Sequence, residues 1–122
     1  MRFFDEAIVG ELSTWIKQSE VTSISLGKYN FDLVTDFISF QAGYRVDFNI
    51  AAIETIWKTG ASDAKVWRLI GQHLKTITLL DLEKLKFLFE TGDSVIVYTE
   101  EGPHECVTIS FGNAAEVERE FF

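Results

Sequence analysis

The sequence has little cysteine and no long apolar segment. Cys106 is the only cysteine, so no disulfide can form within the chain, which agrees with a reducing compartment. No apolar run approaches the roughly 20 residues that a membrane-spanning helix needs. The opening residues, MRFFDEAIVG, place two acids where a signal peptide would have an uninterrupted apolar stretch. From these absences we expect a cytoplasmic protein.

Histidine is also scarce, which limits the available chemistry. His104 and Cys106 would share one face of a strand, but His73 is the only other histidine. A structural zinc site needs four ligands, and a cysteine nucleophile needs a histidine that a third group orients. The segment GKYN lacks both the upstream glycine and the Lys-Ser or Lys-Thr pair of a phosphate-binding loop. We therefore expect no metal, no cofactor and no catalytic residue.

Acidic residues outnumber basic ones. The chain has 19 acids and 11 bases, which gives a net charge of −8 at pH 7. Such a charge repels phosphate backbones and speeds encounters with basic surfaces, so we expect a basic protein partner and no direct contact with nucleic acid. With so many acids, chance pairs on a merely solvated surface are the alternative interpretation. The candidate partner-binding residues are Asp32, Asp36, Glu100, Glu101, Glu116, Glu118, Glu120 and Phe122.

The chain length and composition are typical of a single globular domain, which we assign to residues 1–122. The 122 residues are 47% hydrophobic, enough for one core. Residues 1–20 predict an N-terminal amphipathic helix, because apolar side chains recur at spacings of three and four. These side chains are Phe4, Ile8, Leu12, Trp15 and Ile16.

Two later stretches alternate apolar and polar residues and repeat each other. Residues 21–49 predict a first hairpin unit and residues 74–111 a second one. Ile24 and Phe31 of the first unit match Ile77 and Leu85 of the second, at offsets of 53 and 54 residues. A single hairpin is marginally stable in water, whereas two that share a face form a stable sheet. The sequence therefore predicts an α+β fold: an antiparallel, curled sheet built from two similar hairpin units, with helices packed on it.

The segments outside these units are less regular. Residues 50–73 form a connector, in which residues 50–58 fit either a helix or a strand, with strand favoured. Residues 64–74 predict a short helix that buries Val66, Trp67, Ile70 and Leu74. Residues 112–122 form an acidic tail whose segment AAEVEREFF predicts a short helix. Its aromatic end either docks on the sheet or, together with the acids, faces a basic partner.

A family resemblance adds a functional expectation. The segments ISLGKYNFDLV, LIGQ, LKFLFETGDSVIVY and ECVTI follow one another between residues 21 and 111. This order resembles that of small bacterial immunity proteins encoded beside the toxin domains of contact-dependent growth inhibition and related polymorphic toxin systems. The resemblance implies a non-enzymatic protein that binds one cognate toxin domain, commonly a nuclease, and blocks its active surface. It also implies a monomer outside that complex, and no binding residue carries over from the family.

Two other functions fit the sequence. One is a small-ligand-binding or enzymatic α+β domain with a pocket near His104 and Cys106. The other is an oligomeric accessory protein that associates through an unpaired sheet edge. A deep pocket would favour the first, and self-association in solution would favour the second.

Overall fold

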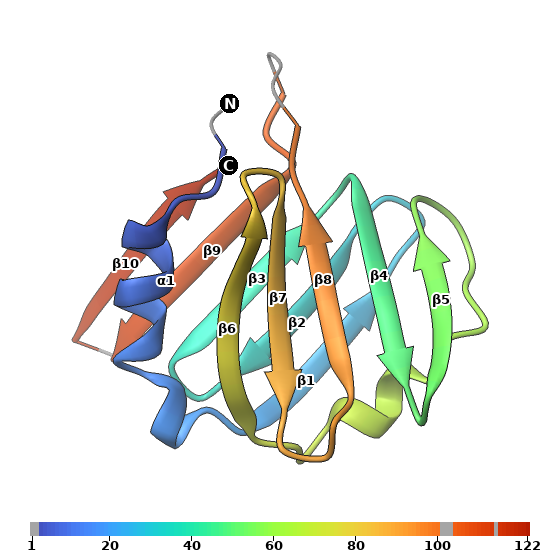
Figure 1. Ribbon diagram of the computed structural model, residues 1–122, viewed down its shortest axis with the longest axis horizontal. Helices are drawn as coiled ribbons and strands as arrows, with labels where there is room; N and C mark the ends of the chain where they lie inside the picture. The colour runs from blue at the N-terminus through green and yellow to red at the C-terminus, as the bar shows by residue number, and fades with distance from the viewer. Residues whose placement is uncertain (1–2, 101–103, 114) are drawn as a thin grey trace.

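Two antiparallel sheets pack face to face and make up most of the molecule (Figure 1). A computed structural model describes residues 3–100, 104–113 and 115–122. In these residues the first sheet has the strand order β1-β2-β3-β9-β10, and the second has the order β5-β4-β8-β7-β6. The strands are β1 (Val21–Leu26), β2 (Phe31–Thr35), β3 (Ile38–Ala42), β4 (Arg45–Ile50), β5 (Ile53–Trp57), β6 (Leu74–Asp81), β7 (Lys84–Phe89), β8 (Ser94–Tyr98), β9 (Val107–Asn113) and β10 (Glu116–Phe121).

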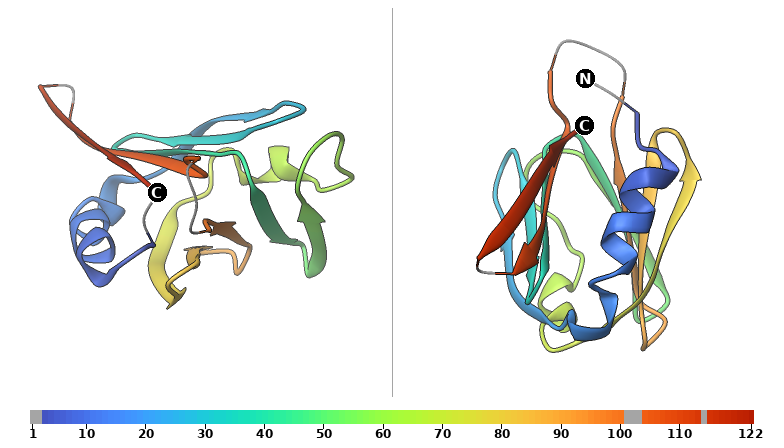
Figure 2. Two further views of the ribbon diagram at one scale, coloured as in Figure 1. Left: turned by 90° about the horizontal axis from the view of Figure 1, so that it is seen from above. Right: turned by 90° about the vertical axis from the view of Figure 1, so that its left-hand side faces the viewer.

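The predicted N-terminal helix is present but shorter than its apolar stripe. Helix α1 (Glu6–Ser13) begins where the Asp5 carboxylate accepts a hydrogen bond from the Ile8 amide at 3.0 Å. Ile8 and Leu12 are buried, and a short 3-10 helix, η1 (Ile16–Gln18), continues the chain. The helix lies between the margins of the two sheets, beside β6 (Figure 2). The predicted α+β class is therefore confirmed. No helix in the described residues is long and apolar enough to cross a membrane.

The two sheets have a related strand order. Strands β1–β3 and β6–β8 each form a three-stranded meander, in opposite sheets, and the following pairs β4–β5 and β9–β10 each join the other sheet. Read from its β6 end, the second sheet has the order β6-β7-β8-β4-β5. It matches the first sheet, β1-β2-β3-β9-β10, when β6, β7 and β8 correspond to β1, β2 and β3 and when β4 and β5 correspond to β9 and β10. The predicted single curled sheet is wrong, because the chain crosses between sheets after β3 and again after β8. Residues 21–49 and 74–111 are each divided between the two sheets.

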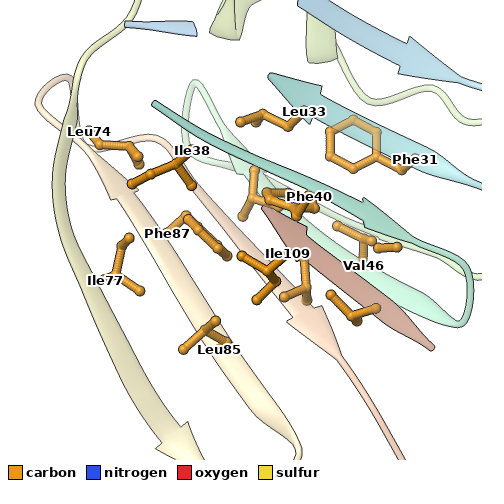
Figure 3. Close-up of a cluster of buried hydrophobic side chains, with 14 of the residues drawn as sticks. Phe31, Leu33, Ile38, Phe40, Val46, Leu74, Ile77, Leu85, Phe87 and Ile109 are labelled. Atoms are coloured by element: carbon orange, nitrogen blue, oxygen red, sulfur yellow. The ribbon is translucent and has the colours of Figure 1, made fainter. Parts of the chain in front are cut away.

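The core lies between the facing sheets and is rich in phenylalanine. The rings of Phe40 in the first sheet and Phe87 in the second are 4.8 Å apart between centroids (Figure 3). Phe31 and Phe48 make a similar contact, edge to face, at 5.0 Å. All four side chains are buried. Burial of each such side chain stabilises the fold by roughly 1.5–3 kcal/mol, so the alternating apolar positions hold the two layers together.

Of the two short helices predicted in the second half of the sequence, the first is present only as a 3-10 turn and the second is replaced by a strand. Residues 64–74 contain only a 3-10 helix, η2 (Val66–Leu69), which buries Val66 and Leu69 and leaves Trp67 and Ile70 exposed. Leu74 is buried, but in β6. Val66 and Leu69 are three residues apart, which places them on one side of the 3-10 turn, and that side packs on the core. Trp67 and Ile70 lie on another side of the turn and face the solvent.

The acidic tail contains a strand, β10, in place of the predicted helix. Val117 and Phe121 are four residues apart, a spacing that places them on one face of a helix and equally on one face of a strand. The pairing of β10 with β9 selects the strand. For residues 50–58, the favoured strand interpretation is confirmed by β5.

The turn between β4 and β5 is held by a buried carboxylate. Ala51 and Ala52 both have positive φ, 54° and 64°, which is an unfavourable conformation for residues with a side chain. The Asp93 carboxylate accepts hydrogen bonds from the Ala51 amide at 3.0 Å, from Arg68 Nε at 3.1 Å and from Gln72 Nε2 at 2.9 Å. Burial alone would raise the pKa of Asp93, but these three donors outweigh it and lower the pKa.

Candidate functional site

The outer face of the first sheet carries a shallow groove. Its floor consists of polar side chains from the central strands: Ser39 and Gln41 of β3, and Thr108 and Ser110 of β9. Its walls are formed by Asp32 and Val34 of β2 on one side and by Arg119 and Phe121 of β10 on the other. The groove encloses about 450 Å³. We call these residues the outer groove.

Strand β10 forms one wall of the outer groove and the edge of the first sheet. Glu118 lies opposite Phe111 and Glu120 opposite Ile109 across the ladder, so these two glutamates and Glu116 occupy the inward side of the strand. Val117, Arg119 and Phe121 occupy the outward side. Glu116 and Glu118 are nevertheless exposed, because β10 lies at the margin of the molecule (Figure 2). The strand therefore presents carboxylates on one side and apolar groups with one guanidinium on the other.

The connection into β10 depends on a glycine. Gly112 has a φ of 125°, a conformation that residues with side chains rarely adopt. A Cβ atom at this position would collide with the carbonyl oxygen of Glu116. The backbones of β9 and β10 therefore approach more closely here than any other residue would allow, which fixes the start of the acidic strand.

A second acidic region lies where β8 ends, near the start of β4. The negative charge of Glu100 is the main cause that raises the pKa of Tyr44, with burial, a hydrogen bond to Glu100 and the charge of Glu83 adding to it. Tyr44 and both glutamates are exposed. We call Tyr44, Glu83 and Glu100 the acidic end. A tyrosine surrounded by carboxylates suits a cationic partner, because its ring packs on apolar or guanidinium groups.

The outer face of the second sheet carries a closed polar network. Arg45 makes two hydrogen bonds with Asp47, at 2.9 and 3.2 Å, and the Tyr98 hydroxyl donates to the same carboxylate at 2.6 Å. The Arg45 guanidinium also lies 4.4 Å from the centre of the Tyr98 ring. Burial, followed by the hydrogen bond and charge of Asp47, raises the pKa of Tyr98 to about 12. Asp47 is therefore fully engaged by donors, and Tyr98 stays protonated at neutral pH.

The predicted partner-binding residues fall into three places. Asp32 and Asp36 lie on or beside the outer groove, and the three glutamates at 116, 118 and 120 lie on β10. Glu100 belongs to the acidic end, and Glu101 lies outside the described residues. The expectation for Phe122 is wrong, because its side chain is fully buried against Phe4, with ring centroids 4.9 Å apart. Phe121 is 46% exposed and is the phenylalanine of the tail that a partner can contact.

The structure offers little support for a catalytic or metal site at His104 and Cys106. Cys106 is buried, and its sulfur lies 3.8 Å from the backbone oxygen of His104. An open hollow of about 280 Å³ lies beside Cys106, but His104 does not line it. Among the described residues, no group of three or more His, Cys, Asp or Glu side chains is placed to hold a metal ion.

Sequence analysis missed two features of these surfaces. The outer groove joins β2, β3, β9 and β10, which only the sheet order brings together. The network at Tyr98 was partly visible in the sequence, because Arg45 and Asp47 are two residues apart and share a strand face. The tyrosine that joins them is 51 residues away from Asp47.

The chain was also compared with models of protein families, with curated proteins and with solved structures, and none of the three comparisons found a match.

Proposed function

We propose that this chain is a non-enzymatic protein of the immunity type, which binds a basic toxin domain, a nuclease in our interpretation, and covers its active surface. The observation that carries the proposal is the character of β10. This exposed edge strand has Glu116 and Glu118 on one side and Val117 and Phe121 on the other. Carboxylates supply attraction to a basic surface, and exposed apolar side chains supply the buried contacts that tight complexes need.

The overall charge supports the same function. A net charge of −8 speeds association with a basic partner, to as much as 10⁸ to 10⁹ M⁻¹s⁻¹ at low salt in favourable cases. Rapid capture is useful to an antidote, because free toxin does damage until it is bound. The acidic end adds a second attractive region with an exposed tyrosine. In this proposal the protein acts in the cytoplasm and is a monomer until it meets the toxin.

The polar clusters of the second sheet support a binding role over a catalytic one. The carboxylates of Asp47 and Asp93 each accept several hydrogen bonds from neighbouring side chains, so neither is a free base. The hollow at Cys106 is open and lacks the convergent histidine that a nucleophile would require. We therefore favour the binding function over the alternative of a small-ligand-binding or enzymatic domain.

We also propose that residues 21–49 and 74–111 are two similar units. The first strand of each has a pairing irregularity at the same place, between Val21 and Ser23 in β1 and between Leu74 and Thr76 in β6. Their burial patterns begin alike, and the corresponding strands occupy the same positions in opposite sheets. In this arrangement the strand that follows each unit, β5 or β10, ends a sheet, and β10 carries the proposed function.

Co-expression with the protein encoded immediately beside its gene tests the proposed function. We expect that protein to stop growth when expressed alone, to be harmless when this chain is present, and to co-purify with it. Binding measured by calorimetry should weaken as the salt concentration rises, because exposed charge pairs are screened. A neighbouring toxin that this chain neither holds nor neutralises would refute the proposal.

A pair of charge-matched variants locates the binding surface. Glu116→Lys with Glu118→Lys, and Glu54→Lys with Glu90→Lys, each replace two exposed glutamates and change the net charge from −8 to −4. We expect the first variant to weaken toxin binding by about a hundredfold, since charged contacts are lost and reversed. The second variant should weaken it about tenfold at most, through the general field alone. Equal losses would show that β10 has no special part in binding.

A further inference from the structure

The backbone of β10 has one unused edge. The Phe122 amide donates to the Val107 carbonyl at 2.7 Å, so residue 122 faces β9 in the hydrogen-bonding direction. Backbone direction alternates along a strand, so residues 116, 118 and 120 also face β9. The amides and carbonyls of Val117, Arg119 and Phe121 therefore point away from the sheet, where β10 is the terminal strand. Edges of this kind pair with strands from other chains.

The side chains of β10 oppose pairing with a second copy of itself. Residues directly opposite each other in an antiparallel ladder lie on the same face of the sheet. In any such pairing of two β10 strands, the glutamates of one would lie opposite glutamates of the other, because all three occupy one side. Like charges in these positions are destabilising. The same row of carboxylates would stabilise an opposing strand that carries Lys or Arg at every second position.

The other terminal strands differ from β10. Strand β5, which ends the second sheet, has one acid, Glu54, between the exposed apolar side chains of Ile53 and Ile56. The start of β6 is bonded to the segment before β1, through the Leu74 amide and the Ser19 carbonyl at 3.0 Å. Strand β1, VTSISL, has no charged residue. Among the terminal strands described, β10 therefore combines a free backbone edge with a charged side.

We propose that β10 is a docking strand. A basic partner would place an extended segment with alternating Lys or Arg residues against its free edge, so that the first sheet of the complex gains a strand. This inference rests on the proposed function only for the basic nature of the partner. The cationic side chains would meet Glu116 and Glu118, and the opposite face of the added strand would extend the outer groove beyond Phe121.

A short synthetic peptide in which Lys alternates with Val is a probe for this edge. Titrated into the ¹⁵N-labelled protein, it should shift the amide signals of Val117, Arg119 and Phe121 most strongly. A peptide of the same composition with its lysines in one block should bind about tenfold more weakly, since few of its charges would lie opposite carboxylates. Equal binding of both peptides, shifts spread over all acidic regions, or no shifts at all would refute strand pairing.

Backbone methylation separates strand pairing from simple charge attraction. Because Cys106 is the only cysteine and precedes β9, residues 1–105 can be ligated to a synthetic segment of residues 106–122. N-methylation at Arg119 removes an outward amide and leaves the β9 ladder intact, so we expect native stability and a loss of alternating-peptide binding of at least about tenfold. N-methylation at Glu118 removes a ladder bond and should lower the melting temperature. Unchanged peptide binding by the Arg119-methylated protein would refute the inference.

These outcomes are independent of the test of the proposed function. A protein that neutralises its neighbouring toxin but ignores the alternating peptide would keep the immunity function and lose the docking strand. A protein that binds the peptide at β10 but has no effect on the toxin would keep the docking strand and lose the immunity function.

Discussion

Strands β5 and β10 occupy equivalent positions but have opposite surfaces. Each is the terminal strand of its sheet, each pairs with the strand that precedes it, and each leads to a buried aromatic residue, Trp57 or Phe122. Strand β5 exposes two isoleucines and one glutamate, whereas β10 exposes two glutamates on one side and Val117 and Phe121 on the other. The comparison shows that the core fixes the inward aromatic at both edges and leaves the rest of each edge strand free to vary.

The largest expected effect concerns the feature that the two edge strands share, a buried aromatic side chain. Trp57→Ala and Phe122→Ala should each lower the free energy of unfolding by about 3–5 kcal/mol, because a large buried ring is replaced by a cavity. Urea denaturation followed by circular dichroism measures both. Tyr29→Ala, at a side chain that is 66% exposed, is the control and should change stability by less than about 0.5 kcal/mol. A small loss for Phe122→Ala would mean that β10 is a loosely attached tail and that the equivalence is false.

An intermediate effect is expected at the turn before β5, which the Asp93 carboxylate holds through a hydrogen bond from the Ala51 amide. Asp93→Asn should lower the free energy of unfolding at pH 7 by about 1–3 kcal/mol, because the donors at Ala51, Arg68 and Gln72 lose a buried, charged acceptor. The folded-state pKa of Asp93 is lowered relative to an unfolded value of about 3.9. Its stabilisation is therefore present above about pH 4 and is lost as the pH falls through the folded-state pKa.

Thermal melts of both proteins across the acidic range check this dependence. The difference between wild type and Asp93→Asn should be largest at neutral pH and should shrink below about pH 4. A difference that stays constant down to pH 2 would show that the carboxylate contributes through shape alone.

The smallest effect concerns the two alanines of that turn. Replacing Ala51 with Asn and Ala52 with Gly should raise the free energy of unfolding by about 1 kcal/mol, because these residues tolerate the positive φ of both positions. Ala7→Gly in α1 is the opposite control and should lower stability, since glycine is unfavourable in a helix. A loss of stability in the turn variant would show that contacts of the alanine side chains matter more than the strain of the positive φ.

Much of the local structure could be predicted from the order of residues. The period of two in segments such as TISF and KFLF was sufficient for the strands, and the spacing of Ile8 and Leu12 was sufficient for the helix. The helix predicted in the tail failed because Val117 and Phe121 fit both periods and the tail was short. Of the candidate binding residues, Glu116 and Glu118 of β10 are exposed and Glu120 is half-buried, whereas Phe122 is fully buried. No local signal distinguishes the two adjacent phenylalanines.

The sequence by itself determined most of the strands, the N-terminal helix, the acidic charge and the scarcity of histidine and cysteine, because each depends on local periodicity or on composition. The tertiary structure decided that the strands form two sheets, that β10 is a terminal strand, and that Phe121 faces outward while Phe122 closes the core. These features depend on contacts between residues far apart in the chain. Ile109 and Glu120 meet only because the chain reverses between β9 and β10, and local preferences carry no information about which strand will lie beside which.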